Sequence, residues 1–518
     1  MNNSILKIEL LQPLAPELRA PIEQEWKRLA TENKLLQDLL RLLRIEKYGG
    51  KSEQLSDRQL ALLELEPGVA AEEIETEAQR SAEEKEKLEE PAAAKPKRPH
   101  PGRHPLPAHL PRVEEVIACT PEQCRCGACG AETKIIGYDT SEELDVKPAE
   151  FFVRVIQREK RVCGQCEESK VSAAPLPAKI VEKGKASNAI IVDVILKKYR
   201  DHLPLYRQAS IWERDAGISI SRMTLCGWVM QGGIWLEAIS ATLREDLLAG
   251  TYIQADETTV GVQTEEKTGA NHQAYLWQYS RPGGPVVFDF QMGRGREGPR
   301  KFLKQFGGRL QCDGYNAYDK IGGEGLVFCG CMAHLRRGFV DTLKVTPGES
   351  AAQAIVSLIA PLYAVEKQAR ESGLDHAQRR ALRQQASVPG LVALKAKIVE
   401  TRQAVLPQST LGKACDYALG QWERVSAYVE YGEVEIDNNW CENAMRPTVL
   451  GRKNWLHIGS EDAGPRVAAI TSVIETCRRL GINEREYLLD VLPKIPGWSA
   501  NRIVELSPMS WAARRAAR

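Results

Sequence analysis

The chain has 518 residues, and its 70 Lys and Arg nearly balance its 69 Asp and Glu, for a formal charge of +1. This length exceeds what one hydrophobic core supports, so we expect two to four domains. A balanced total excludes no class of partner, because local patches bind partners. No apolar run reaches the roughly 18 residues of a membrane span, and the first residues lack the pattern of a signal peptide. We expect a cytoplasmic protein without a membrane partner, whose 13 cysteines are metal ligands and core thiols rather than disulfides.

The N-terminal region predicts a coiled coil. Its seam residues recur at alternating spacings of 4 and 3, and they are Ile22, Trp26, Leu29, Asn33, Leu36, Leu40 and Leu43. Asn33 takes an a position of the heptad, where a buried amide lowers stability but fixes a two-stranded register. The pattern indicates a homodimer or higher oligomer, while a helix packed on its own domain explains the same spacing.

Two segments of opposite charge follow. Residues 64–90 contain 11 Glu and few large apolar residues, which is typical of a solvated linker. Residues 95–112 contain five Lys or Arg, three His and no acid, and their prolines exclude a helix or a central strand. A basic arm of this kind can lie along phosphates or enter a minor groove, so Arg98 and Arg103 are candidate DNA contacts. A plain linker fits the stretch equally well.

Two C-x-x-C pairs predict a zinc ribbon. Their members are Cys126, Cys129, Cys163 and Cys166. Paired thiolates at this spacing can hold one tetrahedral Zn²⁺ from two tight turns. The stretch FFVRVIQREKRV between the pairs alternates like strands, as a ribbon requires. Cys124 competes with Cys126 as a ligand.

Residues 187–235 predict three helices. Pro204 begins the second helix, Gly217 ends it, and Ser221 caps the third. The last two helices, joined by GISI, resemble a helix-turn-helix that reads DNA. Ordinary bundle packing explains the same pattern.

From residue 251 the sequence predicts strands alternating with turns and helices. The expected strands are TYIQAD, QAYLWQYS, GPVVFDF, GRLQCD and GLVFCGC. A mostly helical stretch extends from about 333 to 428, and we expect its charges, such as those of AQRRALRQQ, to form a solvated face. The pattern indicates an α/β core interrupted by a helical insertion.

Two acids are expected at the ends of neighbouring strands of this core. Asp256 and Asp313 each follow a short hydrophobic run, so their carboxylates meet at one sheet edge if the strands are adjacent. Two anions there raise each other's pKa unless a hard cation such as Mg²⁺ joins them. A third acid is expected from a helix over that edge, and EIDNNWCENAMRP supplies Glu442, with Asp437 as its rival.

The ordered motifs resemble the DDE transposases, and specifically those of the bacterial insertion sequence 66 family. They are YGGKSEQLS, GRHPLPAHLPR, the paired C-x-x-C, KYRDHLPLYRQ, ADET, CDGYNAY, GCMAHLRRGF, DNNWCENAMRPTVLGRKNWLHIGSEDAG and ELSPMSW. The resemblance covers nearly the whole chain. The chain departs from the family at Asn443, where arginine is usual, and at Met332, where tryptophan is usual, and ELSPMSW replaces the more usual ELLPWNW. None of these changes removes a carboxylate.

The resemblance implies a DNA transposase that binds transposon ends and catalyses metal-dependent strand cleavage and strand transfer. It implies that Asp256, Asp313 and Glu442 hold two catalytic Mg²⁺ ions and that the zinc is structural. The implied partner is double-stranded DNA, as terminal inverted repeats and as target, in the bacterial nucleoid. Accessory proteins encoded by the same element stay open as further partners.

Other residues near these acids have alternative roles. Glu257 points to the opposite face of the strand from Asp256 and is expected to support the site. The candidate phosphate contacts are Arg336, Arg337, Arg446, Arg452 and Lys453. Trp455 is suited to stack on a base or to pack in the core. Cys329, Cys331 and His334 match metal-ligand types, and a buried turn with a satisfied histidine explains them equally.

The sequence therefore predicts a multidomain α/β protein with a ribonuclease-H-like catalytic core. The expected domains are a coiled-coil helix (1–50), an acidic then basic linker (51–112), a zinc ribbon (113–180), a helical DNA-binding module (181–248), the catalytic domain (249–480) with a helical insertion at about 340–430, and a C-terminal module (481–518). A DNA-binding regulator would not need three acids at one sheet edge. A simple nuclease would not need a zipper and separate DNA-binding modules.

The zinc ribbon yields a direct test. We expect about one Zn²⁺ per chain, lost when Cys163 and Cys166 are replaced by Ser, with loss of folding in residues 110–180 because structural zinc supplies folding free energy. Metal analysis of the freshly purified, reduced protein measures the zinc. A zinc-free wild-type protein would contradict the prediction.

Overall fold

The computed structural model describes the C-terminal two thirds of the chain. The described residues are 150–161, 172–173, 175–182, 184–264, 270–346 and 348–517, with Ile22 and Arg28. The predicted coiled-coil seam apart from Ile22, both linkers and the four zinc-ligand cysteines lie outside them. No helix among the described residues is long and apolar enough to cross a bilayer.

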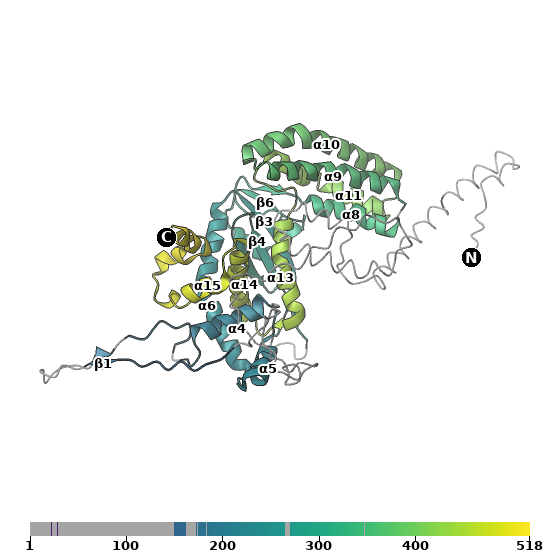
Figure 1. The fold of residues 1–518 in the computed structure, drawn as a ribbon. Helices are drawn as coiled ribbons and strands as arrows, with labels where there is room; N and C mark the ends of the chain where they lie inside the picture. Colours follow the sequence, from purple (N-terminus) through teal and green to yellow (C-terminus); the bar gives the residue numbers. More distant parts are fainter. Residues whose placement is uncertain are drawn as a thin grey trace, which may run out of the picture.

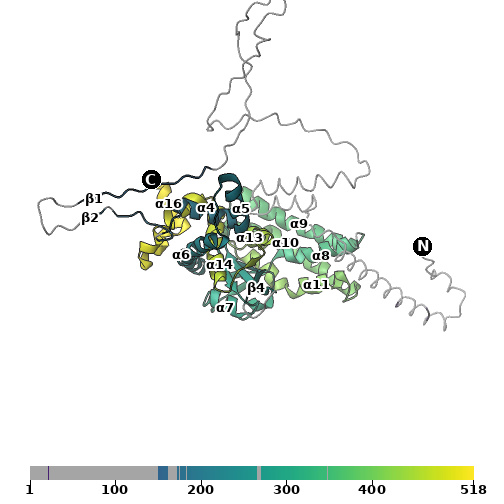
Figure 2. The same cartoon turned by 90° about the horizontal axis from the view of Figure 1, so that it is seen from below.

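The first described segments form a thin ribbon that extends away from the rest (Figures 1 and 2). Its two short strands, β1 (Lys160–Arg161) and β2 (Ser172–Ala173), pair antiparallel. The strand expected over residues 151–159 is wrong, because these residues have no ladder partner among the described residues. Phe152 and Val153 are accordingly 82% and 90% exposed.

Three helices follow as predicted: α4 (Asn188–Tyr199), α5 (Leu205–Ala216) and α6 (Arg222–Ala249). Gly217 ends α5 with a φ of 65°, which a residue without a Cβ adopts at little cost, and the Ser221 side chain accepts from the Thr224 amide to cap α6. Helix α6 extends 14 residues beyond the predicted end at 235. The extension follows from a continued buried stripe, in which Leu236, Ile239, Leu243 and Leu247 join the main hydrophobic cluster.

A mixed six-stranded sheet lies at the centre of the molecule. Its strands are β3 (Tyr252–Val262), β4 (His272–Ser280), β5 (Val286–Gln291), β6 (Arg309–Gln311), β7 (Val327–Cys329) and β8 (His457–Ile458). The order is β5-β4-β3-β6-β7, with β8 paired to β3. β3, β4 and β5 form an antiparallel meander, whereas β6 and β7 run parallel to β3. The strands predicted from the sequence are thus present.

Helices cover both faces of this sheet, and the strand alternation decides which residue meets which helix. On β3, Ile253 and Ala255 join the cluster that contains α6, whereas Val260 and Val262 join the cluster that contains α13 (Asn439–Trp455). Because side chains alternate along a strand, Asp256 belongs to the α13 face. The remaining helices after this point are α14 (Ala463–Arg479), which contacts β5 and α6, α15 (Glu484–Val491) and α16 (Pro508–Ala516).

Between β7 and α13 the chain forms a helical segment at one end of the sheet (Figure 1). Its elements are α8 (Met332–Val345), α9 (Ser350–Glu371), α10 (His376–Ala404), α11 (Thr410–Gly420), α12 (Trp422–Ser426) and the 3₁₀ turn η3 (Ala427–Glu430). A hydrophobic cluster of its own, with Ile355, Leu362 and Leu394 among its members, holds these helices together. Shorter elements complete the chain: α7 (Glu297–Leu303), η2 (Asn316–Tyr318), η4 (Ile495–Gly497) and η5 (Ala500–Leu506).

The charges of AQRRALRQQ include a buried network, so the expectation of a wholly solvated face is wrong. The side chain of Arg383 is 0% exposed; its Nε lies 2.7 Å from Glu366, and its other nitrogens donate to the backbone oxygens of Tyr428, Tyr431 and Val434. Arg379 reaches Glu366 and Glu435, each at 2.6 Å. Arginine suits this role because its planar head satisfies several acceptors at once.

This network makes stability depend on Glu366. Burial raises the pKa of Glu366, but hydrogen bonds from Arg383 and the charge of both arginines outweigh it and hold the pKa below the usual 4.5. Its contribution is present above pH 4.5 and is lost as the pH falls through the lowered value.

We expect Glu366→Ala to destabilise the helical segment by about 3–5 kcal/mol, because it leaves two buried guanidinium groups without their shared anion. The thermal midpoint of unfolding measures the effect. The control is Glu430→Ala, which breaks an exposed pair with Arg380 and should cost about 1 kcal/mol or less. Equal effects of the two substitutions would contradict the prediction.

Candidate active site

Asp256 lies in the middle of β3 rather than at its end. The strand continues to Val262, so the expectation of a short strand that ends in acid is wrong. The extension is stabilised by antiparallel pairing of residues 257–262 with β4 and by β8, which pairs with Gly261 and Val262. The Asp256 carboxylate is nonetheless directed out of the ladder on the α13 face, and its Oδ1 accepts from the Glu257 amide at 2.8 Å.

Asp313 comes next to Asp256 because of the strand register. β3 and β6 are parallel neighbours in which Gln254 pairs with Gln311, and each aspartate follows its glutamine by two residues. Both aspartates therefore belong to the same face, as the sequence predicted. Asp313 Oδ1 accepts from the Tyr315 amide at 2.9 Å, across the turn that Gly314 makes with a φ of 90°.

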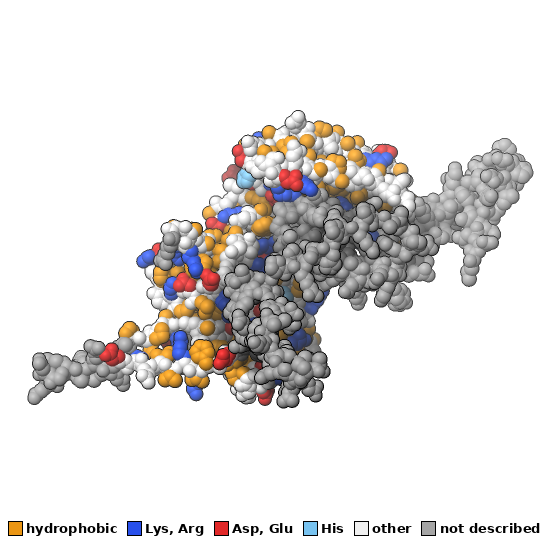
Figure 3. Space-filling model, in the orientation of Figure 1, with side chains coloured by type: hydrophobic (Ala, Val, Ile, Leu, Met, Phe, Trp, Pro, Cys, Tyr) orange, Lys and Arg blue, Asp and Glu red, His pale blue; other side chains and the backbone are white. Residues whose placement is uncertain are grey.

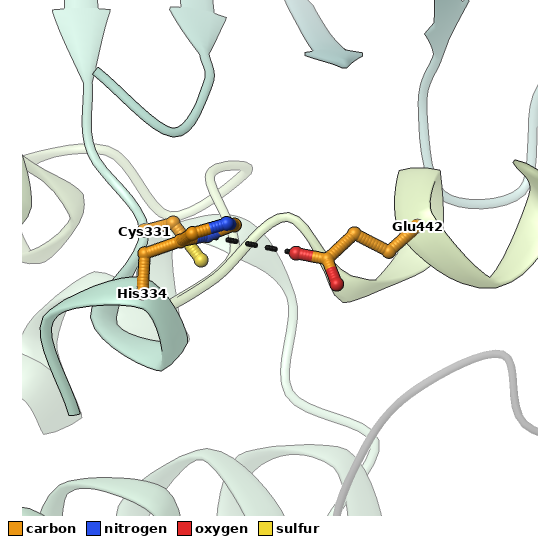
Figure 4. Close-up of side chains that lie close together, drawn as sticks. All are labelled: Cys331, His334 and Glu442. Atoms are coloured by element: carbon orange, nitrogen blue, oxygen red, sulfur yellow. Dashed lines mark ion pairs between the residues drawn. The ribbon is translucent and has the colours of Figure 1, made fainter. Parts of the chain in front are cut away.

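Glu442 reaches this face from the first turn of α13. Its Oε1 lies 3.5 Å from Nδ1 of His334 and its Oε2 lies 3.6 Å from Arg337. Figure 4 shows Glu442 and His334 extending toward each other from two different helices. Glu442 and Asp313 are near enough to Asp256 for their charges to raise the pKa of its carboxyl, so the three predicted carboxylates lie in one neighbourhood.

The electrostatics of this group call for a cation. Burial raises the pKa of Asp256 well above its usual range, and the nearby charges of Glu442, Glu257 and Asp313 raise it further. Glu442 Oε1 is buried without a hydrogen-bond partner. Carboxylate oxygens are the ligands that Mg²⁺ prefers, and a cation would offset the mutual repulsion of these acids, so the residues present fit a hard divalent metal.

Two buried glutamines hold the acids in place, and the sequence analysis missed them. The Gln254 amide group donates to the carbonyl of Asp437 (2.8 Å) and accepts from the backbone N–H of Cys441 (3.1 Å), which ties the start of α13 to β3. The Gln311 amide group donates to the carbonyls of Gly330 and Glu435. The signal was present as a repeated Gln-x-Asp in TYIQAD and GRLQCD.

The rival acids have other partners. The Asp437 carboxylate accepts from the Tyr363 hydroxyl (2.9 Å) and from the backbone N–H of Asn439 (3.2 Å), and burial raises its pKa to about 7. Asp437 directly precedes Asn438, which is the N-cap residue of α13. The Glu257 side chain is 3% exposed and pairs with Arg294 at 2.7 Å, on the opposite face from Asp256 as predicted.

The candidate phosphate contacts differ in their surroundings. Arg337, Arg446 and Lys453 are exposed, while Arg336 is half-buried. Arg452 donates to the Thr258 hydroxyl at 2.9 Å and to Thr259, and so connects α13 to β3. Trp455 packs edge-on against Tyr199 at 6.5 Å, with the Lys198 ammonium 5.5 Å from its ring. Arg98 and Arg103 lie outside the described residues.

The segment that holds all three carboxylates matches a known family. The family model "Transposase IS66 family" matches residues 183–466, which is more than half of the chain. The chain belongs to the IS66 family of transposases. The predicted family is thereby confirmed, and DNA is the partner and transposition the process that membership implies.

Three further models of the IS66 family group match in the expected order. They are "Transposase C of IS166 homeodomain" over residues 35–114, "zinc-finger binding domain of transposase IS66" over 123–167 and "IS66 C-terminal element" over 472–509. The zinc-finger match contains all four predicted ligand cysteines, so it supports zinc binding there.

Relatives in one organism resemble most of this IS66 family member. The uncharacterized protein y4qI of Sinorhizobium fredii (strain NBRC 101917 / NGR234) is 33% identical over 92% of this chain and 88% of the relative. The uncharacterized protein y4jD of the same strain is 32% identical over 79% of this chain and 82% of the relative.

The glutamine anchor generates a stability prediction. We expect Gln254→Met to destabilise the protein by about 1–3 kcal/mol, because it leaves the buried Asp437 carbonyl without this donor, whereas the backbone N–H of Cys441 keeps its bond to the Asn438 carbonyl. The thermal midpoint measures the change. Gln273→Met is the control, since Gln273 is exposed on β4 and bonds only to the Tyr275 hydroxyl among the described residues. A midpoint for Gln254→Met as high as that of the control would contradict the anchor.

Proposed function

We propose that this protein is a DNA transposase that binds the ends of its insertion sequence and catalyses metal-dependent strand cleavage and strand transfer. The observation that carries the proposal is the position of Asp256 and Asp313 on one face of the adjacent strands β3 and β6, with Glu442 on the helix α13 that packs over that face. Membership of the IS66 family supports the same activity.

We assign the catalytic domain to the ribonuclease-H-like class, with the helical segment α8–η3 as an insertion. An antiparallel meander of β5, β4 and β3 continued by parallel β6 and β7 supports this assignment. The insertion would have a mechanical role. Through Arg379 and Arg383 it holds residues 428–435, the stretch that leads into α13 and Glu442.

Two Mg²⁺ ions held by Asp256, Asp313 and Glu442 would supply activation of the attacking oxygen and stabilisation of the leaving oxygen on phosphorus. The chain's own residues do the positioning. Gln254 fixes α13 against β3, and the β3–β6 register holds the two aspartates side by side. Arg337, 3.6 Å from Glu442 and exposed, is suited to contact the phosphate that reacts.

The DNA path is proposed to follow one stripe of α13. Arg446 lies one helical turn beyond Glu442 and Lys453 two turns further on, and both are exposed. Figure 3 shows cationic and anionic side chains interspersed over the visible described surface, in keeping with the balanced total charge. Local cations near the carboxylates therefore matter more than net charge. The N-terminal turn of α6, with Arg222 and Met223 exposed, is the part of the α5–α6 pair available to a DNA groove.

The triad is tested by cleavage of a labelled transposon end in Mg²⁺. We expect Asp256→Asn, Asp313→Asn and Glu442→Gln each to lower the cleavage rate by about a thousandfold or more, equal to about 4 kcal/mol of barrier, with DNA binding retained. Asp341→Asn is the control, since Asp341 is exposed and pairs with Lys344. If Asp437→Asn is inactive while Glu442→Gln is active, Asp437 is the third metal ligand in place of Glu442. Near-normal cleavage by Asp256→Asn or Asp313→Asn would refute the triad.

A second measurement separates the active site from the fold. Asp256→Asn should keep or raise the thermal midpoint in metal-free buffer at neutral pH. Burial and the neighbouring acids raise the pKa of Asp256, so its ionised form costs free energy that the amide does not. A marked drop in the midpoint would mean that Asp256 is a structural residue.

A further inference from the structure

A second group of side chains that can bind metal lies next to the candidate active site, between Glu442 and the start of α8. Cys331 precedes α8 directly, His334 lies in the first turn of α8, and Glu442 faces them from α13. One ligand atom from each lies within 4.8 Å of the other two (Figure 4). Three side chains from two helices thus converge on one point.

The nitrogen and oxygen of this group lack hydrogen bonds. His334 Nδ1 and Glu442 Oε1 are both buried, neither has a hydrogen-bond partner, and the 3.5 Å between them exceeds a normal hydrogen bond. Burial lowers the pKa of His334 despite the nearby Glu442 charge, which favours the neutral form of imidazole that binds metal. Buried polar atoms without partners require an explanation, and a bound cation supplies one.

The sulfur is positioned by the backbone. Cys331 is buried, and its Sγ accepts from the backbone N–H of Asn438 at 3.5 Å. Burial, with the charges of Asp437 and Glu442, raises the pKa of this thiol well above its usual range. A divalent cation between the three side chains offsets those anions and displaces the thiol proton to solvent, as metal binding to cysteine does.

We propose that Cys331, His334 and Glu442 form a binding site for a zinc-class divalent ion, with water as the fourth ligand. Sulfur, imidazole and carboxylate together suit Zn²⁺, Co²⁺ or Cd²⁺, whereas Mg²⁺ takes an all-oxygen set. Zn²⁺ bonds of about 2.0–2.3 Å place tetrahedral ligand atoms roughly 3.5 Å apart. The His334 and Glu442 ligand atoms already have this separation, so binding requires only a small movement that brings the Cys331 sulfur closer to them.

The site has a regulatory consequence that rests on the proposed function. A zinc-class ion bound on the α8 side occupies a carboxylate oxygen of Glu442 that the Mg²⁺ ions would otherwise use. It also adds positive charge beside the place of the Mg²⁺ ions, which opposes their binding. Zinc-class ions are therefore inhibitors of the Mg²⁺-dependent reaction at this site, and Glu442 is the ligand for which the two kinds of metal compete.

The binding test uses the full chain loaded with Zn²⁺ and dialysed, with metal content measured per chain. The zinc ribbon accounts for the one Zn²⁺ expected in the protein as purified and contributes equally to every variant. The additional ion taken up on loading, measured as the difference between variants, is therefore diagnostic. We expect wild type and Cys329→Ser to hold one Zn²⁺ more than Cys331→Ser and His334→Asn. Cys329 is the matched control, since it is equally buried on β7 and outside the cluster. In the Co²⁺-loaded proteins, Cys331→Ser should also show a weaker sulfur-to-metal absorption than wild type.

Equal zinc content in all four proteins would overturn the proposal. Should Cys331→Ser unfold, His334→Asn alone decides, because His334 is partly exposed and its ring nitrogen has no hydrogen bond to lose.

The activity arm titrates Zn²⁺ into the Mg²⁺ cleavage reaction, each protein normalised to its own zinc-free rate. Wild type should be inhibited at a Zn²⁺ concentration at least tenfold below that needed for His334→Asn, and a chelator should reverse the inhibition. Equal sensitivity would remove the regulatory role. If wild type cleaves nothing at any Mg²⁺ concentration but holds the additional Zn²⁺, the proposed function fails while the metal site stands.

Discussion

The hydrogen bonds of two buried glutamines are the constraint on which the candidate site depends. Gln254 and Gln311 are register partners on β3 and β6, and the amide of Gln254 also donates to the Gln311 side chain at 2.9 Å. Together they satisfy backbone groups at residues 330, 435, 437 and 441. Because a buried polar group without a partner is costly, these hydrogen bonds favour the observed position of the start of α13 against the strands. The three carboxylates meet as a result.

The helical segment between β7 and α13 extends this constraint outward. It separates Asp313 from Glu442 by more than a hundred residues of sequence. Its Arg383 nevertheless donates hydrogen bonds to the backbone of residues 428 and 434, in the stretch that leads to α13. Arg379 and Arg383 both pair with Glu366, so these hydrogen bonds depend on buried charges that compensate one another. A buried network of this kind stabilises little by itself but penalises any other arrangement. We regard the segment as the element that positions the third acid.

Glu442 lies between two groups of possible metal ligands. On the sheet side its charge raises the pKa of Asp256, and on the α8 side it faces His334, the Cys331 thiol and Arg337. The metal-free arrangement is thus electrostatically unfavourable on one side and incompletely hydrogen-bonded on the other. Sites that bind metal commonly retain such costs, because groups arranged for a cation cannot also satisfy one another. The side chain is held where either kind of divalent ion can reach it.

The sequence by itself determined the strands, the helix caps at Ser221 and Gly217, the candidate acids and the family, because these depend on local periodicity, turn chemistry and motif order. Only the tertiary structure decided that β3 extends past Asp256, that α6 runs on to Ala249, that Arg383 is buried, and that Cys331 and His334 converge on Glu442. Each of these depends on a partner distant in the chain: a neighbouring strand, a packed helix or a buried anion. Local sequence records which side chains are available, and long-range packing decides which of them meet.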